Sequence, residues 1–218
     1  MILAAGRGTR MRELTDNCPK PLLQVAGKSL IEYPIEALAS AGIQRIVINT
    51  AYLGHMLEET LGDGSRWDIE ILYSHEQALG LETAGGIINA LPLLGQEPFI
   101  VVNGDVWSDY DFAQLSLGKN QLAKLVLVDN PAHNLEGDFA IDADKRLSLC
   151  ALPRYTFSGI GIYHPSFFDG LSTGFRPLRE PLQQGIDQGC VGATYYRGDW
   201  QDIGTPERLL ALQQQLST

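Results

Sequence analysis

The chain has 218 residues, 44% of them hydrophobic and 19% charged, and a formal net charge of −10, which together describe an acidic globular domain with a substantial core. The acidic balance argues against a nucleic-acid partner, because phosphate backbones are bound by basic faces. The sequence shows no basic cleavable leader, no apolar run of the ~20 residues that cross a bilayer, and no metal-ligand spacing among its cysteines, so we expect one cytoplasmic domain, residues 1–218, that does not bind membranes.

Apolar strands alternate with amphipathic helices in the first half of the chain, in the pattern of βαβ units. Ser29 and Glu32 have the spacing of a capping box, and the helix that they open is expected to end at Gly42. This order predicts an α/β, Rossmann-like fold with a mixed, mainly parallel sheet flanked by helices. Strands are expected at residues 2–5, 45–49, 69–73 and 99–102, and further helices at 53–61 and near 86–91.

The second half is less regular, but its last helix has a clear start. Thr205, Pro206 and Glu207 provide an N-cap, a proline in the first helical position and a first-turn acid, which predicts a terminal helix that ends near residue 216. No repeat or linker interrupts this half, which favours a single domain. It is expected to contain strands at 125–128, 157–163, 193–196 and 200–203, a hairpin of 138–142 with 146–149, and a helix at 178–188.

A loop rich in glycine and arginine, residues 6–10, follows the first strand. Gly6 and Gly8 let the backbone approach an anion closely, the exposed N–H groups of such a loop attract phosphate, and Arg10 can add a planar fork of donors. The loop has neither the G-K-[ST] ending of a P-loop nor the dinucleotide pattern G-x-G-x-x-G. An ordinary strand-to-helix turn is the alternative interpretation.

A lysine between two prolines follows this loop. Pro21 is expected to hold Lys20 in an extended conformation, and Pro19 fixes its own φ, so the segment is stiff. The two segments together resemble the signature of the sugar nucleotidyltransferase family, L-A-A-G-x-G-T-R-[LM] followed by P-K-P. The resemblance implies a GT-A-like domain that transfers a nucleotidyl group from a nucleoside triphosphate to a sugar 1-phosphate. It also implies that Arg10 and Lys20 are catalytic and that the nucleotide is bound by Ala4, Ala5, Gly6, Gly8, Thr9, Arg10 and Lys20.

Two aspartates follow strands that are far apart in the sequence. Asp105 comes directly after the strand at 99–102, beside Gly104, which is expected to leave room for a ligand, and Asp202 precedes the terminal helix. Ligands collect at the carboxyl ends of strands in such sheets, and two carboxylates suit a Mg²⁺ ion that keeps several waters. The family has metal-binding aspartates at both positions, so Mg²⁺ is the expected cofactor. Each aspartate alone could instead cap backbone N–H groups, which is how we interpret Asp109 and Asp111.

Base and sugar contacts are implied by the resemblance at later positions. Glu76 and Gly85 align with the family's base-contacting loop, although Glu76 could equally be a surface acid. Asn103, Gly137 and Asp138 match positions that contact the sugar. Residues 151–155 lack the Glu-Lys-Pro of hexose-1-phosphate thymidylyl- and uridylyltransferases, which disfavours glucose 1-phosphate.

Five stretches resemble the branch of the family that joins UTP to N-acetylmuramate 1-phosphate in peptidoglycan recycling: 61–66, 81–87, 102–112, 127–131 and 156–160. No histidine is needed as a general base, because a phosphate monoester is already ionised at neutral pH; the four histidines are interpreted as structural or surface residues. A mannose-1-phosphate guanylyltransferase, a glucose-1-phosphate thymidylyl- or uridylyltransferase and a non-catalytic nucleotide-sugar sensor are the alternatives. The sequence contains no signal for an oligomeric state.

Overall fold

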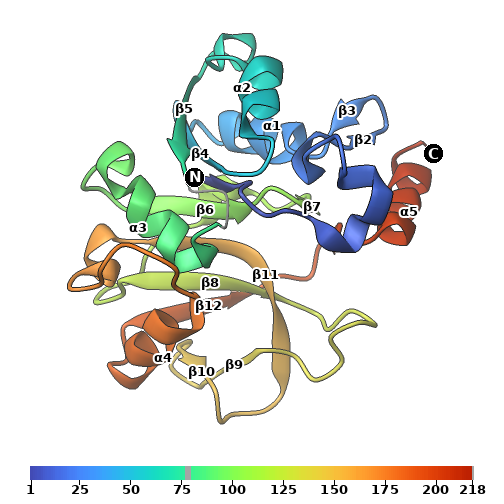
Figure 1. The fold of residues 1–218 in the computed structure, drawn as a ribbon. Coiled ribbons are helices and arrows are strands. Elements are labelled where there is room, and N and C mark those ends of the chain that lie inside the picture. Colours follow the sequence, from blue (N-terminus) through green and yellow to red (C-terminus); the bar gives the residue numbers. More distant parts are fainter. Residues whose placement is uncertain (77–79, 218) are drawn as a thin grey trace.

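The computed structural model describes residues 1–76 and 80–217 and is built on a nine-stranded mixed sheet (Figure 1). The strand order is β10-β9-β11-β6-β1-β4-β5, and β8 joins β11 to β12 outside this path. The strands β5, β4, β1 and β6 are parallel, whereas β11 runs antiparallel to β6 and β8. The bounds are β1 (Ile2–Leu3), β4 (Arg45–Thr50), β5 (Glu70–His75), β6 (Phe99–Asn103), β8 (Ala123–Val128), β9 (Phe139–Ile141), β10 (Leu147–Ser148), β11 (Arg154–Tyr163) and β12 (Val191–Tyr195).

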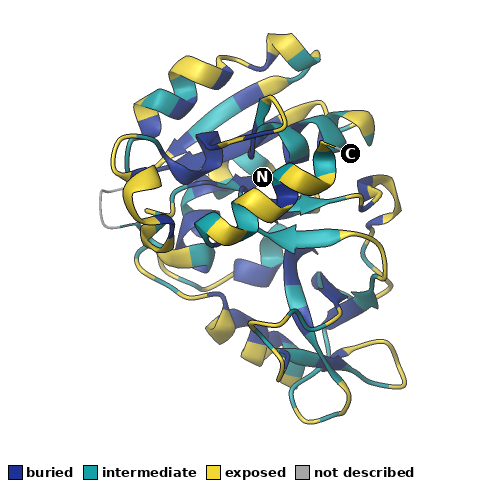
Figure 2. Ribbon diagram, turned by 90° about the vertical axis from the view of Figure 1, so that its right-hand side faces the viewer, coloured by how far each residue is buried: buried dark blue, intermediate teal, exposed yellow. Residues whose placement is uncertain are grey.

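Helices cover both faces of this sheet, which confirms the predicted α/β class. Successive residues of a strand point to opposite faces: Ile46 and Ile48 pack in one apolar cluster with α1 and α2, whereas Val47 packs in another with α3 and α4. Figure 2 shows buried and intermediate residues along the strands, with exposed residues on the outer sides of helices and in loops. The helices are α1 (Glu32–Ser40), α2 (Gly54–Leu61), α3 (Glu82–Leu94), α4 (Arg179–Asp187) and α5 (Pro206–Leu216).

Two small sheets and five 3-10 helices complete the described fold. The hairpin of β2 (Gln24–Val25) with β3 (Lys28–Ser29) and the pair of β7 (Val106–Ser108) with β13 (Trp200–Asp202) form separate two-stranded sheets. A third apolar cluster joins α5 to the segment after the first strand, through Met11, Ile203 and Leu212. None of the helices in residues 1–76 and 80–217 is long and apolar enough to span a membrane. The 3-10 helices are η1 (Thr9–Thr15), η2 (Lys20–Leu22), η3 (Ser65–Trp67), η4 (Phe112–Gln114) and η5 (Pro165–Phe168).

Every strand and helix predicted above is present, although most of them have ends that differ from the prediction by up to four residues. The first strand ends at Leu3, because the N–H of Ala4 donates to the side chain of Asn49 (2.8 Å). The prediction that Lys20 is extended was wrong: it begins a 3-10 turn in which Leu23 N–H donates to the Lys20 carbonyl (3.1 Å). Pro21 is tolerated as the second residue of this turn, because an N–H in the first turn of a helix would have no hydrogen-bond partner within the turn.

The helix starts differ in how much capping they show. The Glu32 carboxylate accepts from the N–H and the hydroxyl of Ser29 (2.7 and 2.6 Å), but no side chain caps α1, so only half of the capping box forms. The cap of α5 is confirmed, since Thr205 Oγ1 accepts from the N–H of Arg208 (3.4 Å). Helix α3 begins at Glu82, four residues before the segment expected from the sequence.

Candidate functional site

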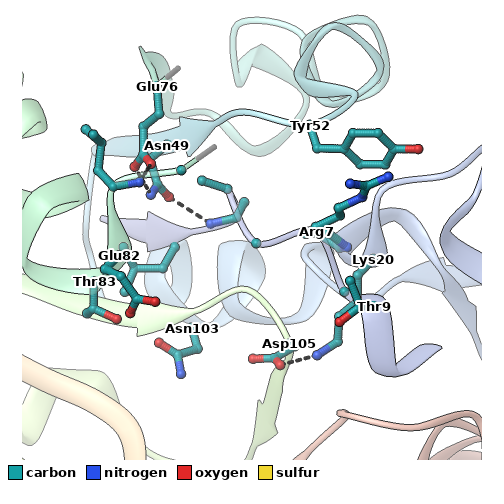
Figure 3. A pocket seen from close by; sticks show the side chains of 18 of the residues that line it. Arg7, Thr9, Lys20, Asn49, Tyr52, Glu76, Glu82, Thr83, Asn103 and Asp105 are labelled. Carbon is teal, nitrogen blue, oxygen red and sulfur yellow. Dashed lines mark hydrogen bonds and ion pairs between the residues drawn. The ribbon is translucent and has the colours of Figure 1, made fainter. Parts of the chain in front are cut away.

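A cavity of about 750 Å³ opens where β1, β4, β5 and β6 end (Figure 3). The strand β1 lies in the sheet between β4 and β6. The strands that follow β1 in the chain are therefore added first on one side of it and then on the other, and open α/β sheets bind ligands at such a switch point. The volume is in the range of small-molecule sites. Ten of the predicted site residues line it: Ala4, Ala5, Gly6, Gly8, Thr9, Arg10, Lys20, Glu76, Asn103 and Asp105.

The loop after β1 is held tightly against Lys20. Gly8 has φ +65°, and a Cβ atom there would lie 2.9 Å from the Cβ of Lys20. The Gly8 carbonyl also accepts from the N–H of Met11 (2.8 Å) and the hydroxyl of Thr15 (3.1 Å). Glycine is therefore required at residue 8 by both its conformation and its contacts, which place the loop beside the lysine.

Replacing Gly8 with alanine should lower the free energy of unfolding by about 2 kcal/mol, since it adds both backbone strain and a clash. The neighbouring Gly6 is a matched control: it has no positive φ, and a Cβ atom added there would meet nothing within 4 Å. Gly6→Ala should stay within about 0.5 kcal/mol of the parent in urea denaturation. Equal effects of the two substitutions would contradict this account of the loop.

Lys20 and Asp105 form an ion pair at the centre of the site. The side chain of Lys20 is only 11% exposed, so most of this ion pair is shielded from solvent on the lysine side. The expected role of Gly104 was wrong: its N–H donates to the Leu3 carbonyl (2.8 Å), and a Cβ would lie 3.0 Å from that oxygen. Gly104 therefore lets β1 approach closely and leaves no space for a ligand.

Asp202 does not line the cavity, but β13 brings its backbone beside that of Asp105. It pairs with Val106 in the antiparallel β7–β13 ladder, and the N–H of Ile203 donates to the Asp105 carbonyl (2.8 Å). The two predicted metal ligands are thus neighbours in space, although 97 positions separate their numbers (202 − 105). This is the main juxtaposition that the sequence predicted and the structure provides.

Arg208 is a site residue that the sequence reasoning missed. Its guanidinium donates to Asp202 Oδ1 (2.5 Å) and lies against Gly204, where a Cβ would be 2.2 Å from Arg208 Nη2 and 3.5 Å from Arg10 Cζ. His133 Nε2 is 3.1 Å from the same Asp202 oxygen, although the side chain of this histidine is exposed. The only signal for Arg208 is its position one turn after the Thr205 cap.

The two aspartates fit a magnesium site by their chemistry. Within residues 1–76 and 80–217, no group of three or more His, Cys, Asp or Glu residues could hold a metal. Mg²⁺ commonly takes one or two carboxylates and completes its shell with water and substrate phosphates. A pair of carboxylates beside a loop suited to phosphates meets that requirement.

Glu76 connects two elements at the end of the cavity away from Lys20. Its carboxylate accepts from Asn49 Nδ2 (2.6 Å) and from the N–H of Leu81 (2.8 Å), so it links β4 to the start of α3. Gly86 is the glycine that this contact needs, because a Cβ there would lie 2.5 Å from Glu76 Oε1. Gly85 does not line the cavity; its N–H donates to the Arg176 carbonyl (3.1 Å).

Gly137 and Asp138 lie outside the cavity lining and shape the loop between β8 and β9. Asp138 Oδ2 accepts from the N–H of Phe157 (2.8 Å) and from Asn134 (3.2 Å). Gly137 has φ +65°, and a Cβ there would be 2.8 Å from the carbonyl carbon of Arg154. The same loop carries His133 to Asp202, and the predicted contact of Gly137 and Asp138 with the sugar stays a prediction.

The two aspartates interpreted as caps behave differently from each other. Asp111 caps η4, accepting from the N–H of Ala113 (3.0 Å). Asp109 is not a cap, because its carboxylate accepts from the hydroxyl of Tyr196. Burial, followed by this hydrogen bond, raises the pKa of Tyr196.

Comparisons with known proteins show which family this chain resembles. Residues 1–139 match the model of the family described as Nucleotidyl transferase. The N-acetylmuramate alpha-1-phosphate uridylyltransferase of Neisseria meningitidis serogroup B is 50% identical over 217 residues, covering 96% of this chain and 94% of that protein. The enzyme of the same name from Caulobacter vibrioides is 31% identical over 236 residues, covering 100% and 96%.

A solved structure shows the same fold at low identity. The inositol-1-phosphate CTP transferase of T. maritima superposes with a TM-score of 0.77 at 20% identity, covering 99% of this chain and 94% of that one. The glycine loop, the lysine and the aspartate pair are therefore placed on a fold that this enzyme shares. From the match over residues 1–139 and the identity to full-length relatives, the chain belongs to the nucleotidyl transferase family.

Proposed function

We propose that this protein transfers the uridylyl group of UTP to N-acetylmuramate 1-phosphate, giving UDP-N-acetylmuramate and pyrophosphate, as a cytoplasmic step of peptidoglycan recycling. The observation that carries the proposal is the Lys20–Asp105 ion pair beside the glycine loop, with Asp202 next to it. The name of the relative that shares 50% identity supports the choice of substrates.

The charges lining the cavity suggest how the substrates lie. Arg7, Arg10 and Lys20 line one end, where the phosphates would be neutralised, and the linked pair of Asn49 and Glu76 lines the other, where the nucleoside would lie. A sugar phosphate oxygen would attack the α-phosphorus, and pyrophosphate would leave. Because that oxygen is already ionised, the residues act by aligning the phosphates and neutralising their charge.

Each predicted residue has a defined part in this reaction. Lys20 would bridge the two phosphates that react, while Arg10 and the N–H groups of the loop would hold the β- and γ-phosphates. Asp105 and Asp202 would hold Mg²⁺, which supplies positive charge at the α-phosphate when bound. Asn103, which lines the cavity at the end of β6, would contact the sugar.

A screen of the purified chain tests the proposal directly. Four nucleoside triphosphates would be combined with N-acetylmuramate, N-acetylglucosamine, glucose and mannose 1-phosphates, and pyrophosphate release measured with Mg²⁺ present. UTP with N-acetylmuramate 1-phosphate should give the highest kcat/KM. Preference for GTP with mannose 1-phosphate would favour the guanylyltransferase alternative. Nucleotide binding without pyrophosphate release from any pair would favour a sensor.

A further inference from the structure

Glu82, the first residue of α3, has a backbone conformation that residues with side chains seldom adopt. Its φ is +62°, in the left-handed region where a Cβ atom crowds the following carbonyl. Such strain persists only where the surrounding structure imposes it, and it collects at ligand-binding sites. Glycine would adopt this conformation without strain, so the presence of glutamate at residue 82 needs an explanation.

The backbone on both sides of Glu82 is fixed by other residues. The N–H of Leu81 donates to Glu76 (2.8 Å), and the Leu81 carbonyl accepts from the N–H of Arg176 (2.9 Å). On the other side, the N–H of Gly85 donates to the Arg176 carbonyl (3.1 Å). The carboxylate of Glu82 makes no hydrogen bond or ion pair with the described part of the chain, residues 1–76 and 80–217. The backbone of Glu82 is thus held in place, whereas its carboxylate contributes no hydrogen bond or ion pair to the described part of the fold.

The side chain points into the cavity. Glu82 is among the lining residues, and Figure 3 shows its carboxylate reaching inward from the start of α3, across the cavity from Lys20 and Arg7. Phosphates would gather at the cationic end, so a carboxylate on the other side of the cavity would be repelled less than one beside them. A carboxylate is an acceptor only, and the partners that suit it here are neutral O–H and N–H donors.

We propose that Glu82 is a substrate-binding residue whose carboxylate accepts hydrogen bonds from hydroxyl or N–H groups in the uncharged part of a substrate. The inference rests on the proposed function, which offers two sources of such donors. One is the uridine of UTP, with its ribose hydroxyls and uracil N–H; the other is the sugar 1-phosphate, with its hydroxyls and acetamido N–H. The strained backbone is what aims the carboxylate at them.

Three substitutions separate binding from strain. Glu82→Gly removes both the carboxylate and the strain, Glu82→Ala removes only the carboxylate, and Glu82→Gln removes only the charge. We expect Glu82→Gly to raise the melting temperature by about 2–4 °C and Glu82→Ala and Glu82→Gln to leave it near the parent value. All three should raise KM for the contacted substrate, by about tenfold or more for Gly and Ala. Measuring KM for UTP and for the sugar 1-phosphate separately identifies which one is contacted.

Asp68→Gly is the matched control. Asp68 is also an exposed acid in the left-handed region (φ +56°), but it does not line the cavity. It should show a comparable thermal gain with both KM values unchanged. If both KM values stay within about twofold of the parent in Glu82→Ala and Glu82→Gly, or if Glu82→Gly lowers the melting temperature, the proposal is overturned.

The parent protein separates this outcome from failure of the proposed function. If it releases pyrophosphate from no substrate pair, the function is wrong, and calorimetric affinities for UTP and for each sugar 1-phosphate are then compared across the same variants. A loss of affinity for one of them in Glu82→Ala would still support the binding role. Unchanged affinities would reject that role too.

Discussion

Lys20→Ala is expected to abolish pyrophosphate release, with a loss of about 10³-fold or more in kcat, and to leave the fold intact. In the proposed reaction Lys20 is the cation nearest the phosphorus under attack, and its position is fixed by Asp105 and by the close approach of Gly8. The loss should fall on kcat, because the lysine neutralises charge that develops in the transition state. Steady-state assays with both substrates saturating would measure it.

Two controls make the Lys20 result interpretable. Lys119→Ala removes an exposed lysine that does not line the cavity and should keep full activity. The melting temperature of Lys20→Ala should stay close to that of the parent, because Asp105 is 25% exposed and can be hydrated once its partner is gone. Near-normal pyrophosphate release from Lys20→Ala would reject the mechanism.

The parts of the site that were predictable are those encoded locally. The glycine loop and the Pro-Lys-Pro segment lie next to β1, and ten predicted residues line one cavity. Asp105 follows β6 of the main sheet, as predicted from the apolar segment before it. Asp202 reaches it by another route, because it lies on β13, which pairs with β7 in a separate two-stranded sheet that the sequence did not predict.

The residues that were missed depend on contacts between distant segments. Arg208 contacts Asp202 from the first turn of α5, which the Thr205 cap begins, and His133 contacts it from the loop that contains Gly137 and Asp138. The Glu76 contact with Asn49 was hidden for the same reason, since no spacing links the ends of β4 and β5. Likewise, the role of Gly104 depends on β1, which lies about a hundred residues away in sequence.

Asp202→Ala is expected to abolish turnover as completely as Lys20→Ala, about 10³-fold or more, again without unfolding the protein. The carboxylate is 27% exposed and lies against Arg208 and His133, which can both be solvated when it is removed. Asp202→Asn keeps the shape but not the charge, so a comparable loss in this variant would show that charge is what the site requires. Asp199→Ala, an exposed aspartate nearby, should remain active.

Magnesium dependence separates the two roles open to Asp202. If it holds the ion with Asp105, Asp202→Asn should need far more Mg²⁺ for its residual rate, and calorimetry with Mg²⁺ alone should show weakened binding. If it only orients Arg208, the Mg²⁺ requirement of the residual rate in Asp202→Asn should match that of the parent. A fully active Asp202→Ala would reject both roles, because the reaction would then proceed without the Asp202 carboxylate. Asp105, which is paired with Lys20, would be the one predicted metal ligand left.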